Sequence, residues 1–535
     1  MNRVTRWLGL VAACCALLLG NAGAWAEDGA QHFDIFEYEV EGNTVLPEEP
    51  IERAVYPFLG ERRTAADVDG ARAALEKAYH DAGFLTVSVE VPEQKVDEGL
   101  VRLRVVEGRI QRTRVAGAEY SLPSRLKEGT PSMAEGTVPN FNEVQEDLGR
   151  LARNPDMRVT PLLRSGRNPG SVEMELAIED KSPLHGSVEL NNKQSADTKT
   201  GRIEASVRYD NLWQRRHSIG LSWFVSPRNR DDVEVWALNY SMPVGRDATL
   251  AAYAVNSDSD VPTVFGTQSL GRGSTVGLRW VKPLPMRAGL FHSVALGADY
   301  KDNKQDTRLF GGVLNLSQPV RYTTLAANWN GSAVDTGSEW RFGAGLTLGM
   351  EAFNARSINC NGVVVDQFEC RRPGATPSFS VLRLDLQHTR QLLAGVSAFV
   401  RFDLQRTGSP LVNTEQFAAG GIDSVRGYLE SERVGDMGTR ASFELRAPRM
   451  ALADGRVGLM PLAFYDWASV RIREPLPGQD ARALMAGAGI GLRFDVAQAF
   501  SGELMWAHAL HDGAAGPGRT RDGDDRAILR IKYVF

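Results

Sequence analysis

Residues 527–535, AILRIKYVF, end the chain on an alternating pattern. Apolar side chains share one face and the remaining ones share the other: Leu529, Ile531, Tyr533 and Phe535 against Arg530, Lys532 and Val534. Successive side chains of a β-strand point to opposite sides, so one face of this strand is apolar and the other largely polar. Such a strand fits the wall of a membrane β-barrel, with lipid outside and a polar lumen inside.

The same alternation recurs upstream, and long and short connections follow each other in turn, as in an up-and-down membrane barrel. A soluble sandwich or propeller shares the strand period but does not explain the loop asymmetry. We therefore predict a 16-stranded antiparallel barrel over residues 185–535, whose even strand number puts both barrel ends on the periplasmic side. The predicted strands are residues 186–192, 202–209, 217–225, 233–241, 248–256, 274–281, 292–300, 322–330, 339–350, 379–388, 395–406, 439–447, 457–467, 485–495, 501–509 and 527–535.

Composition excludes two other classes of protein. Of the 535 residues 43% are hydrophobic and 24% charged, and the longest uncharged apolar run, residues 7–20, is too short for a membrane-spanning helix. Lys and Arg number 61 against 66 Asp and Glu, a net charge of -5. No basic excess points to nucleic acid, and we expect no nucleic-acid partner.

The N-terminus has the features of a secretory signal peptide over residues 1–26. Arg3 and Arg6 precede the apolar run, and a small-residue site at 24–26 would be cleaved before Glu27. The rival interpretation is a lipidation site at Cys14, although the apolar run continues beyond it. An exported chain folds in an oxidising compartment, so we predict a disulfide between Cys360 and Cys370, with two free thiols as the alternative.

The pattern of residues 33–182 differs from that of the predicted barrel because it mixes strands with helices. Spacings of three and four between apolar residues predict helices over 65–82 and 141–153. Two similar units result, 33–110 and 111–182, each ordered as strand, helices, strand, strand.

One motif identifies the family that the chain resembles. Between the eleventh and twelfth predicted strands stand Phe417, Gly420, Gly421, Ser424, Val425, Arg426, Gly427 and Tyr428. This string is similar to F-x-x-G-G-x-x-S-V-R-G-Y of two-partner secretion transporters, the haemolysin secretion/activation type. The units 33–110 and 111–182 likewise resemble POTRA 1 and POTRA 2 of that superfamily. The resemblance implies α+β POTRA repeats in the periplasm followed by an all-β 16-stranded barrel in the outer membrane of a Gram-negative bacterium.

The arginine of this motif requires a partner if loop 407–438 folds into the lumen, because an unpaired buried charge is unfavourable. Asp466, in the thirteenth strand, resembles the aspartate of the family's F-x-D-x-G motif, which pairs with the loop arginine. Ala468 stands where that motif has glycine. We expect Arg426 and Asp466 to form a charge pair in the lumen.

The resemblance implies a pore that recognises an unfolded exoprotein, of adhesin or haemolysin type, through its POTRA domains and exports it without nucleotide hydrolysis. Outer-membrane lipid surrounds such a barrel, and barrel assembly machinery and periplasmic chaperones are its expected partners during biogenesis. An assembly or insertion factor of the same superfamily is the main alternative. Family members often carry a plug helix before the first POTRA domain, but residues 27–32 are too few for one, so loop 407–438 is expected to close the lumen.

Catalysis is not expected. The metalloprotease, P-loop and nucleophile-elbow motifs are absent from the sequence. The run Gly487-Ala488-Gly489-Ile490-Gly491 lies within a predicted strand and indicates close packing in the barrel wall rather than a dinucleotide loop. We expect no metal and no cofactor. A barrel enzyme or passive porin is left as an alternative, but neither would require paired periplasmic domains.

Overall fold

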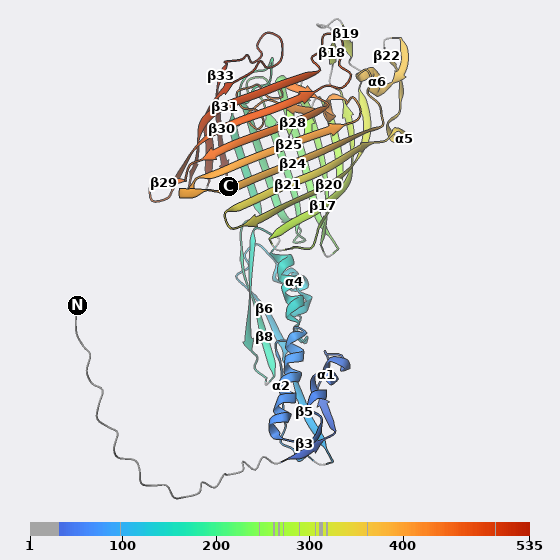
Figure 1. Cartoon of the computed structure of the whole chain (residues 1–535), viewed down its shortest axis with the longest axis vertical. Coiled ribbons are helices and arrows are strands. Elements are labelled where there is room, and N and C mark those ends of the chain that lie inside the picture. The colour runs from blue at the N-terminus through green and yellow to red at the C-terminus, as the bar shows by residue number, and fades with distance from the viewer. Residues whose placement is uncertain are drawn as a thin grey trace, which may run out of the picture. The chain divides into compact units, whose positions relative to one another are not determined.

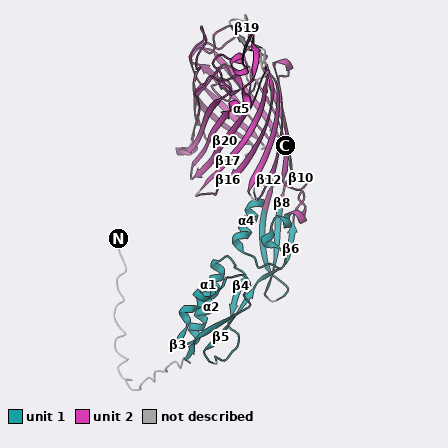
Figure 2. Ribbon diagram, turned by 90° about the vertical axis from the view of Figure 1, so that its right-hand side faces the viewer, with its two compact units in different colours: residues 1–117, 126–153, 159–178 teal, residues 118–125, 154–158, 179–535 magenta. Residues whose placement is uncertain are grey.

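The computed structural model describes residues 32–535 except for 97, 153, 169, 246, 260–262, 266–267, 271, 288, 305–306, 310–313, 317–318, 361 and 498. The predicted signal peptide at 1–26 and the alternative lipidation site at Cys14 lie outside these residues. The chain forms two units: residues 1–117, 126–153 and 159–178 make the first, and 118–125, 154–158 and 179–535 the second (Figure 2).

The first part of unit 1 packs two helices on a mixed sheet. The helices are α1 (Glu48–Val55) and α2 (Ala65–Asp81), with a 3-10 turn η1 (Tyr56–Phe58) between them. The sheet order is β2 (Glu37–Glu41), β5 (Leu100–Glu107), β4 (Val87–Glu90), in which β2 and β5 are parallel. Strand β1 (Phe33–Ile35) pairs instead with β3 (Gly60–Arg63). Phe36 separates β1 from β2, and its N–H donates to the Gly99 carbonyl at 2.8 Å.

The start and the packing of α2 follow from its sequence. Thr64 and Asp67 form a capping box at its N-terminus. Its buried stripe includes Leu75 and Tyr79, which join the core of this part. The Tyr79 hydroxyl donates to Asn43 Oδ1 at 2.8 Å, and burial raises the pKa of Tyr79 to about 12.

The second part repeats this topology. Its strands are β6 (Arg109–Ala116), β7 (Met157–Ser165) and β8 (Ser171–Asp180), in the order β6-β8-β7, and β6 and β8 are parallel. The helical segments are α3 (Pro123–Glu128), η2 (Pro131–Met133) and α4 (Phe141–Leu151). Val144 and Leu151 are buried on the inner face of α4. A parallel pairing of first and last strand requires a long crossover, which the helices provide.

The barrel of unit 2 closes with sixteen long antiparallel strands in the described part of the chain, so the predicted fold class is confirmed (Figure 1). They are β9 (Leu184–Asn191), β10 (Arg202–Leu212), β11 (His217–Val225), β12 (Val233–Val244), β13 (Ala248–Ser259), β16 (Gly273–Pro283), β17 (Leu290–Asn303), β20 (Val320–Asp335), β21 (Ser338–Gly349), β24 (Phe379–Gln391), β25 (Ser397–Thr407), β28 (Met437–Arg446), β30 (Val457–Arg471), β31 (Arg482–Val496), β32 (Phe500–Ala509) and β33 (Asp525–Val534). The short β29 (Met450–Leu452) pairs with the start of β30. Strand β33 pairs with β9 and closes the ring.

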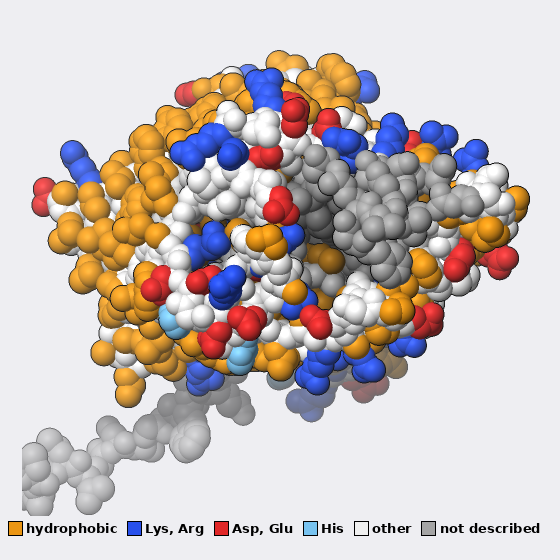
Figure 3. Space-filling model, turned by 90° about the horizontal axis from the view of Figure 1, so that it is seen from above, with side chains coloured by type: hydrophobic (Ala, Val, Ile, Leu, Met, Phe, Trp, Pro, Cys, Tyr) orange, Lys and Arg blue, Asp and Glu red, His pale blue; other side chains and the backbone are white. Residues whose placement is uncertain are grey.

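Along the wall strands, exposed apolar side chains on the outer face alternate with more buried and often polar side chains on the inner face. In β30 Tyr465 is exposed whereas its neighbour Asp466 is buried, and in β33 Leu529 and Ile531 are exposed on either side of Arg530. Seen from above, hydrophobic side chains surround the barrel and charged ones lie across its middle (Figure 3). No helix in the described residues has the length and apolarity to cross a membrane.

The connections differ at the two ends of the barrel. Segments such as 213–216, 336–337 and 453–456 are tight turns, whereas 350–378, 408–436 and 510–524 are long loops with structure of their own. Loop 350–378 contains α5 (Glu351–Asn354), the hairpin β22 (Ser357–Cys360) and β23 (Val363–Asp366), and α6 (Gln367–Arg371). This alternation places the long loops together at one rim, where they meet one another.

Candidate functional site: the loop inside the barrel

Loop 408–436, between β25 and β28, forms a hairpin of its own. After the 3-10 turn η6 (Asn413–Glu415), β26 (Phe417–Ala419) pairs with β27 (Arg433–Gly435). The motif glycines permit its tight course: Gly420 and Gly421 both have φ of 107°, and Gly427 has 101°. A Cβ on Gly420 would lie 2.5 Å from the carbonyl oxygen of Leu429. Glycine is therefore required here for both backbone conformation and close approach.

The side chain of Arg426 makes several hydrogen bonds to the barrel wall. Its side chain is 5% exposed, and it packs across the ring of Phe464 at 3.6 Å from the centroid. Nε and Nη2 donate to the two carboxylate oxygens of Asp466 at 2.7 and 2.8 Å. The Arg426 backbone N–H donates to the same carboxylate at 3.0 Å. Asp466 is fully buried, so the structure brings these two predicted site residues together as a bidentate pair on the inner face of the barrel.

A second carboxylate, which sequence reasoning missed, completes the environment of Arg426. Glu444 Oε1 accepts from Arg426 Nη1 at 2.7 Å and is itself buried. It also pairs with Arg446 and Arg493, at 2.7 and 2.9 Å. Its signal in the sequence was weak: β28 carries polar residues at every second position, but alternation alone does not reveal which of them faces the loop arginine.

The apolar motif residues pack against the wall beside this charge cluster. Val425 and Tyr428 are buried together with Ala468, Met485 and Ala509. Ala468, where the family motif has glycine, is thus a packing residue here. The Ser424 hydroxyl accepts from the backbone N–H of Gly420 at 3.2 Å, which stabilises the turn of the motif. The ring of Phe417 lies across Gly438 of β28, with its edge where a Cβ would stand.

Further acidic residues of the loop bind other parts of the barrel. Glu415, which is buried, accepts from Lys301 Nζ at 2.5 Å and from the Tyr322 hydroxyl at 2.8 Å. The N–H of Glu430 donates to the carbonyl of Gln194, in loop 192–201, at 2.9 Å. Glu432 accepts from the N–H and hydroxyl of Thr520 at 2.7 and 2.6 Å, which ties the hairpin to loop 510–524. The loop is therefore bound to the barrel near its start, through Glu415, and again further along, through Glu430 and Glu432.

Asp436, another acidic residue of the loop, connects the hairpin to the loop that carries the disulfide. Cys360 and Cys370 are disulfide-bonded, and the bond joins hairpin β22–β23 to α6. Directly after α6, Arg372 pairs with the fully buried Asp436 through both guanidinium Nη atoms. The Arg473 N–H donates to Asp436 at 2.7 Å. The loop that this disulfide closes therefore holds the end of the hairpin loop through Arg372.

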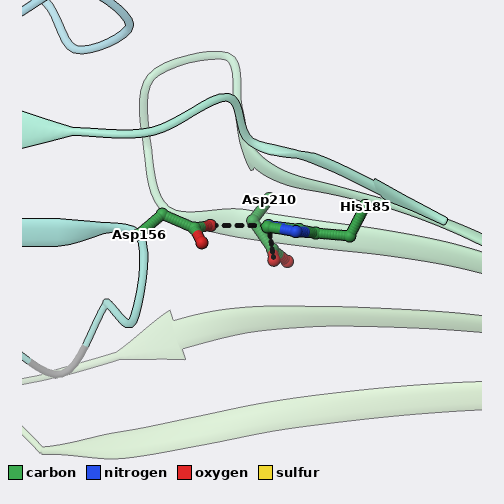
Figure 4. A group of neighbouring side chains, drawn as sticks. All are labelled: Asp156, His185 and Asp210. Atoms are coloured by element: carbon green, nitrogen blue, oxygen red, sulfur yellow. Dashed lines mark hydrogen bonds and ion pairs between the residues drawn. The ribbon is translucent and has the colours of Figure 1, made fainter. Parts of the chain in front are cut away.

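A separate group of side chains lies at the opposite rim, where β9 begins and β10 ends (Figure 4). His185 Nε2 is 2.8 Å from Asp156 Oδ2 and 3.6 Å from Asp210 Oδ2. The atoms are close enough to share a metal ion, but Arg208 Nε also donates to Asp210 Oδ2 at 2.8 Å. Since these carboxylates already have cationic or hydrogen-bonding partners, we regard the group as a charge-balanced network rather than a metal site.

Comparison with known proteins gives consistent matches. The sequence profile of the family described as haemolysin secretion/activation protein ShlB/FhaC/HecB matches residues 170–494, and that of the ShlB-type POTRA domain matches 33–108. An outer membrane transporter CdiB from Escherichia coli is 25% identical over 439 residues, which cover 77% of this chain and 68% of that protein. The solved structure of CdiB from Escherichia coli has a TM-score of 0.65 at 20% identity, covering 96% and 93% of the two chains. BamA from Haemophilus ducreyi lacking POTRA domains 1–3 has a TM-score of 0.54 at 15% identity, covering 94% and 100%. The two structural likenesses concern the fold alone.

Proposed function

Because the chain belongs to the haemolysin secretion/activation protein family, we propose that it exports an unfolded partner exoprotein through the lumen of its barrel. The family match confirms the resemblance drawn from the loop motif. The protein is a two-partner secretion transporter of the outer membrane with POTRA domains in the periplasm. We further propose the boundaries 1–26 for a signal peptide, 33–110 and 111–182 for the POTRA domains, and 185–535 for the barrel with loop 407–438 folded inward.

The observation that supports export through the lumen most directly is the hairpin held by Arg426. A passive porin needs an open lumen, whereas here a loop is bound to the inner wall through buried charges. An exoprotein passing through the lumen requires this hairpin to move aside. Its buried charge pairs set the free energy of that movement, so the pore is closed at rest and opens when the partner engages it. Folding of the exoprotein outside would favour outward movement without nucleotide hydrolysis.

We propose that strand β7 of the second POTRA unit receives the exoprotein. In the described residues β7 has a strand neighbour, β8, along one edge, and its other edge is unpaired. Leu162 and Leu163 of β7 are 38% and 42% exposed. An unpaired edge extends a sheet by binding an extended segment, and exposed apolar side chains add affinity for an unfolded chain.

An outer-membrane assembly factor is the alternative function, and its substrates would be barrels. The fold likeness to BamA does not distinguish the two functions. The longer loop string from Phe417 to Tyr428 and the pair of POTRA units favour secretion. The barrel assembly machinery and periplasmic chaperones remain proposed partners for the insertion of this barrel, and catalysis by the chain is not proposed.

A secretion assay tests these alternatives. The gene is deleted and replaced with wild type, Arg426→Ala, or the exposed control Arg482→Ala, and mass spectrometry then quantifies the culture medium, cell surface and outer membrane. Loss of one large exoprotein with other barrels unchanged, restored by wild type and by the control, supports export. A general fall in outer-membrane barrels would instead favour the assembly factor. No change in either fraction would contradict both functions.

A further inference from the structure

The backbone of the Arg426 turn rests directly on the barrel wall. A Cβ on Gly427 would lie 3.3 Å from the Ala509 nitrogen and 3.4 Å from the His508 carbonyl carbon, both in β32. On the other side of the turn, the Arg426 carbonyl oxygen lies against Gly487 of β31. The turn is therefore seated on two adjacent strands, through backbone as well as side-chain contacts.

Contact with β31 depends on the missing side chain at Gly487. A Cβ at this position would lie 2.1 Å from the Arg426 carbonyl oxygen and 3.3 Å from its carbonyl carbon. Real Cβ atoms do not approach backbone oxygen so closely, so even alanine would displace the turn or the strand. Gly487 has ordinary backbone geometry and is not among the residues with positive φ. Its requirement for glycine therefore comes from space rather than from conformation.

Tyr428 fixes the turn on the same strand, one residue away. Its hydroxyl lies 2.9 Å from the carbonyl of Ala486 and 2.7 Å from that of His511, and it accepts from the His511 N–H at 3.2 Å. The turn thus has a backbone contact at Gly487 and a side-chain contact at Ala486. Asp466 is paired with Gly487 in the β30–β31 register, so this contact lies directly beside the charge pair.

We propose that Gly487 is a positioning residue that seats the Arg426 turn so that its guanidinium reaches Asp466 and Glu444. The importance for export of the contact between Gly487 and the Arg426 turn rests on the proposed function, but the contact itself does not. A Cβ on Gly489, two residues along, would lie 2.0 Å from the Trp506 carbonyl oxygen and 2.6 Å from Cζ of Phe464, so this glycine serves packing within the wall. Of the glycines of β31, Gly487 is the one at which an added Cβ would meet the loop backbone.

A matched pair of substitutions separates this role from a general need for glycine in a barrel strand. Gly220 of β11 is also a wall glycine without positive φ, and a Cβ there would approach Cγ of Arg208 and the Val207 carbonyl oxygen no closer than 3.7 Å. Gly487→Ala and Gly220→Ala make the same chemical change, and alanine is no worse than glycine in a strand. Only the first introduces a clash with the loop backbone.

The test measures amide hydrogen exchange of the full-length protein in detergent, together with exoprotein export from cells. For Gly487→Ala we expect exchange of residues 420–430 to accelerate at least about tenfold, while the wall strands of the barrel keep their protection. Gly220→Ala should resemble wild type. Equal protection of the loop in Gly487→Ala and wild type would overturn the inference. A released loop with normal export would uphold the seating of the turn and refute the proposed role of the docked loop.

A second variant keeps the test informative if Gly487→Ala fails to insert. Tyr428→Phe removes the hydroxyl from the loop side and leaves the wall intact, so it weakens the same contact without a clash. Amide exchange of the loop that is faster than in wild type, by a smaller factor than in Gly487→Ala, supports the contact between the turn and β31. Unchanged loop exchange in this variant would contradict it.

Discussion

The charge pair between Arg426 and Asp466 gives the sharpest quantitative prediction, for the substitution Asp466→Asn. Both carboxylate oxygens are fully used: one accepts from the backbone N–H and Nε of Arg426, the other from Nη2 of Arg426 and the hydroxyl of Ser442. In one orientation the NH2 group of an asparagine opposes the backbone N–H and Nε of Arg426. In the other it opposes Nη2 of Arg426 but can donate to the Ser442 hydroxyl, which is able to accept. The variant therefore loses the charge and at least one of the four hydrogen bonds, with little change in volume.

The expected loss is large because the site is buried. Removing one partner of a buried pair typically destabilises by about 3–5 kcal/mol. Glu444 continues to bind the arginine, so we expect the lower end, about 3 kcal/mol. Since about 1.4 kcal/mol corresponds to a tenfold change in an equilibrium constant, the undocked population of the loop should rise roughly 100-fold.

Single-channel recording in planar lipid bilayers detects this change, since an undocked loop leaves the lumen more open. We expect longer and more frequent openings for Asp466→Asn. The control is Asp495→Asn, whose carboxylate pairs with Arg449 at a distance of 2.5 Å but is exposed. Solvent and salt screen an exposed pair, so the control should conduct like wild type. Equal channel behaviour of Asp466→Asn and wild type would refute the claim that this pair holds the loop in place.

Three more outcomes are expected. Arg426→Ala should abolish export while heat-modifiable electrophoresis shows a folded barrel; normal export would refute its role. Arg372→Ala leaves the buried carboxylate of Asp436 without its cationic partner and should increase channel openings, and reduction of the disulfide should act more weakly in the same direction; unchanged channel openings in both cases would contradict the proposed link. Leu163→Asp should lower exoprotein cross-linking to the full-length protein severalfold without changing barrel assembly, and undiminished cross-linking would argue against β7 as the receiving edge.

The sequence alone was sufficient for the local features of the fold. Successive side chains of a strand point to opposite faces, so the sixteen strands could be predicted as segments of alternating residues. The number of these segments and the lengths of their connections predicted the barrel, which is confirmed. Helix α2 was equally visible because its buried residues recur at helical spacing. Helix α1 was missed, since Pro47 and two glutamates mark its start but eight residues give a weak periodic signal.

The loop arginine was also visible from the sequence, because an arginine in a glycine-rich motif requires a partner wherever it is buried. Asp466 was named through the family resemblance, and the structure brings the two residues into contact. Glu444 and Asp436 were not named, and Gly487 was named only for close packing in the barrel wall, not for contact with the loop. Each is distant in sequence from the residue it meets, and nothing in its local pattern shows which residue that is.

The alternation of each strand thus fixed which of its side chains face inward, while closure of the barrel decided which inward side chains face one another. Register between strands places Ser442 opposite Asp466, and Gly487 opposite Asp466 on the other side, so three separate segments of chain surround one arginine. The physical reason is that strand periodicity is a local property of the backbone. Contacts between a loop and the wall depend instead on register and curvature, which only the closed tertiary structure sets.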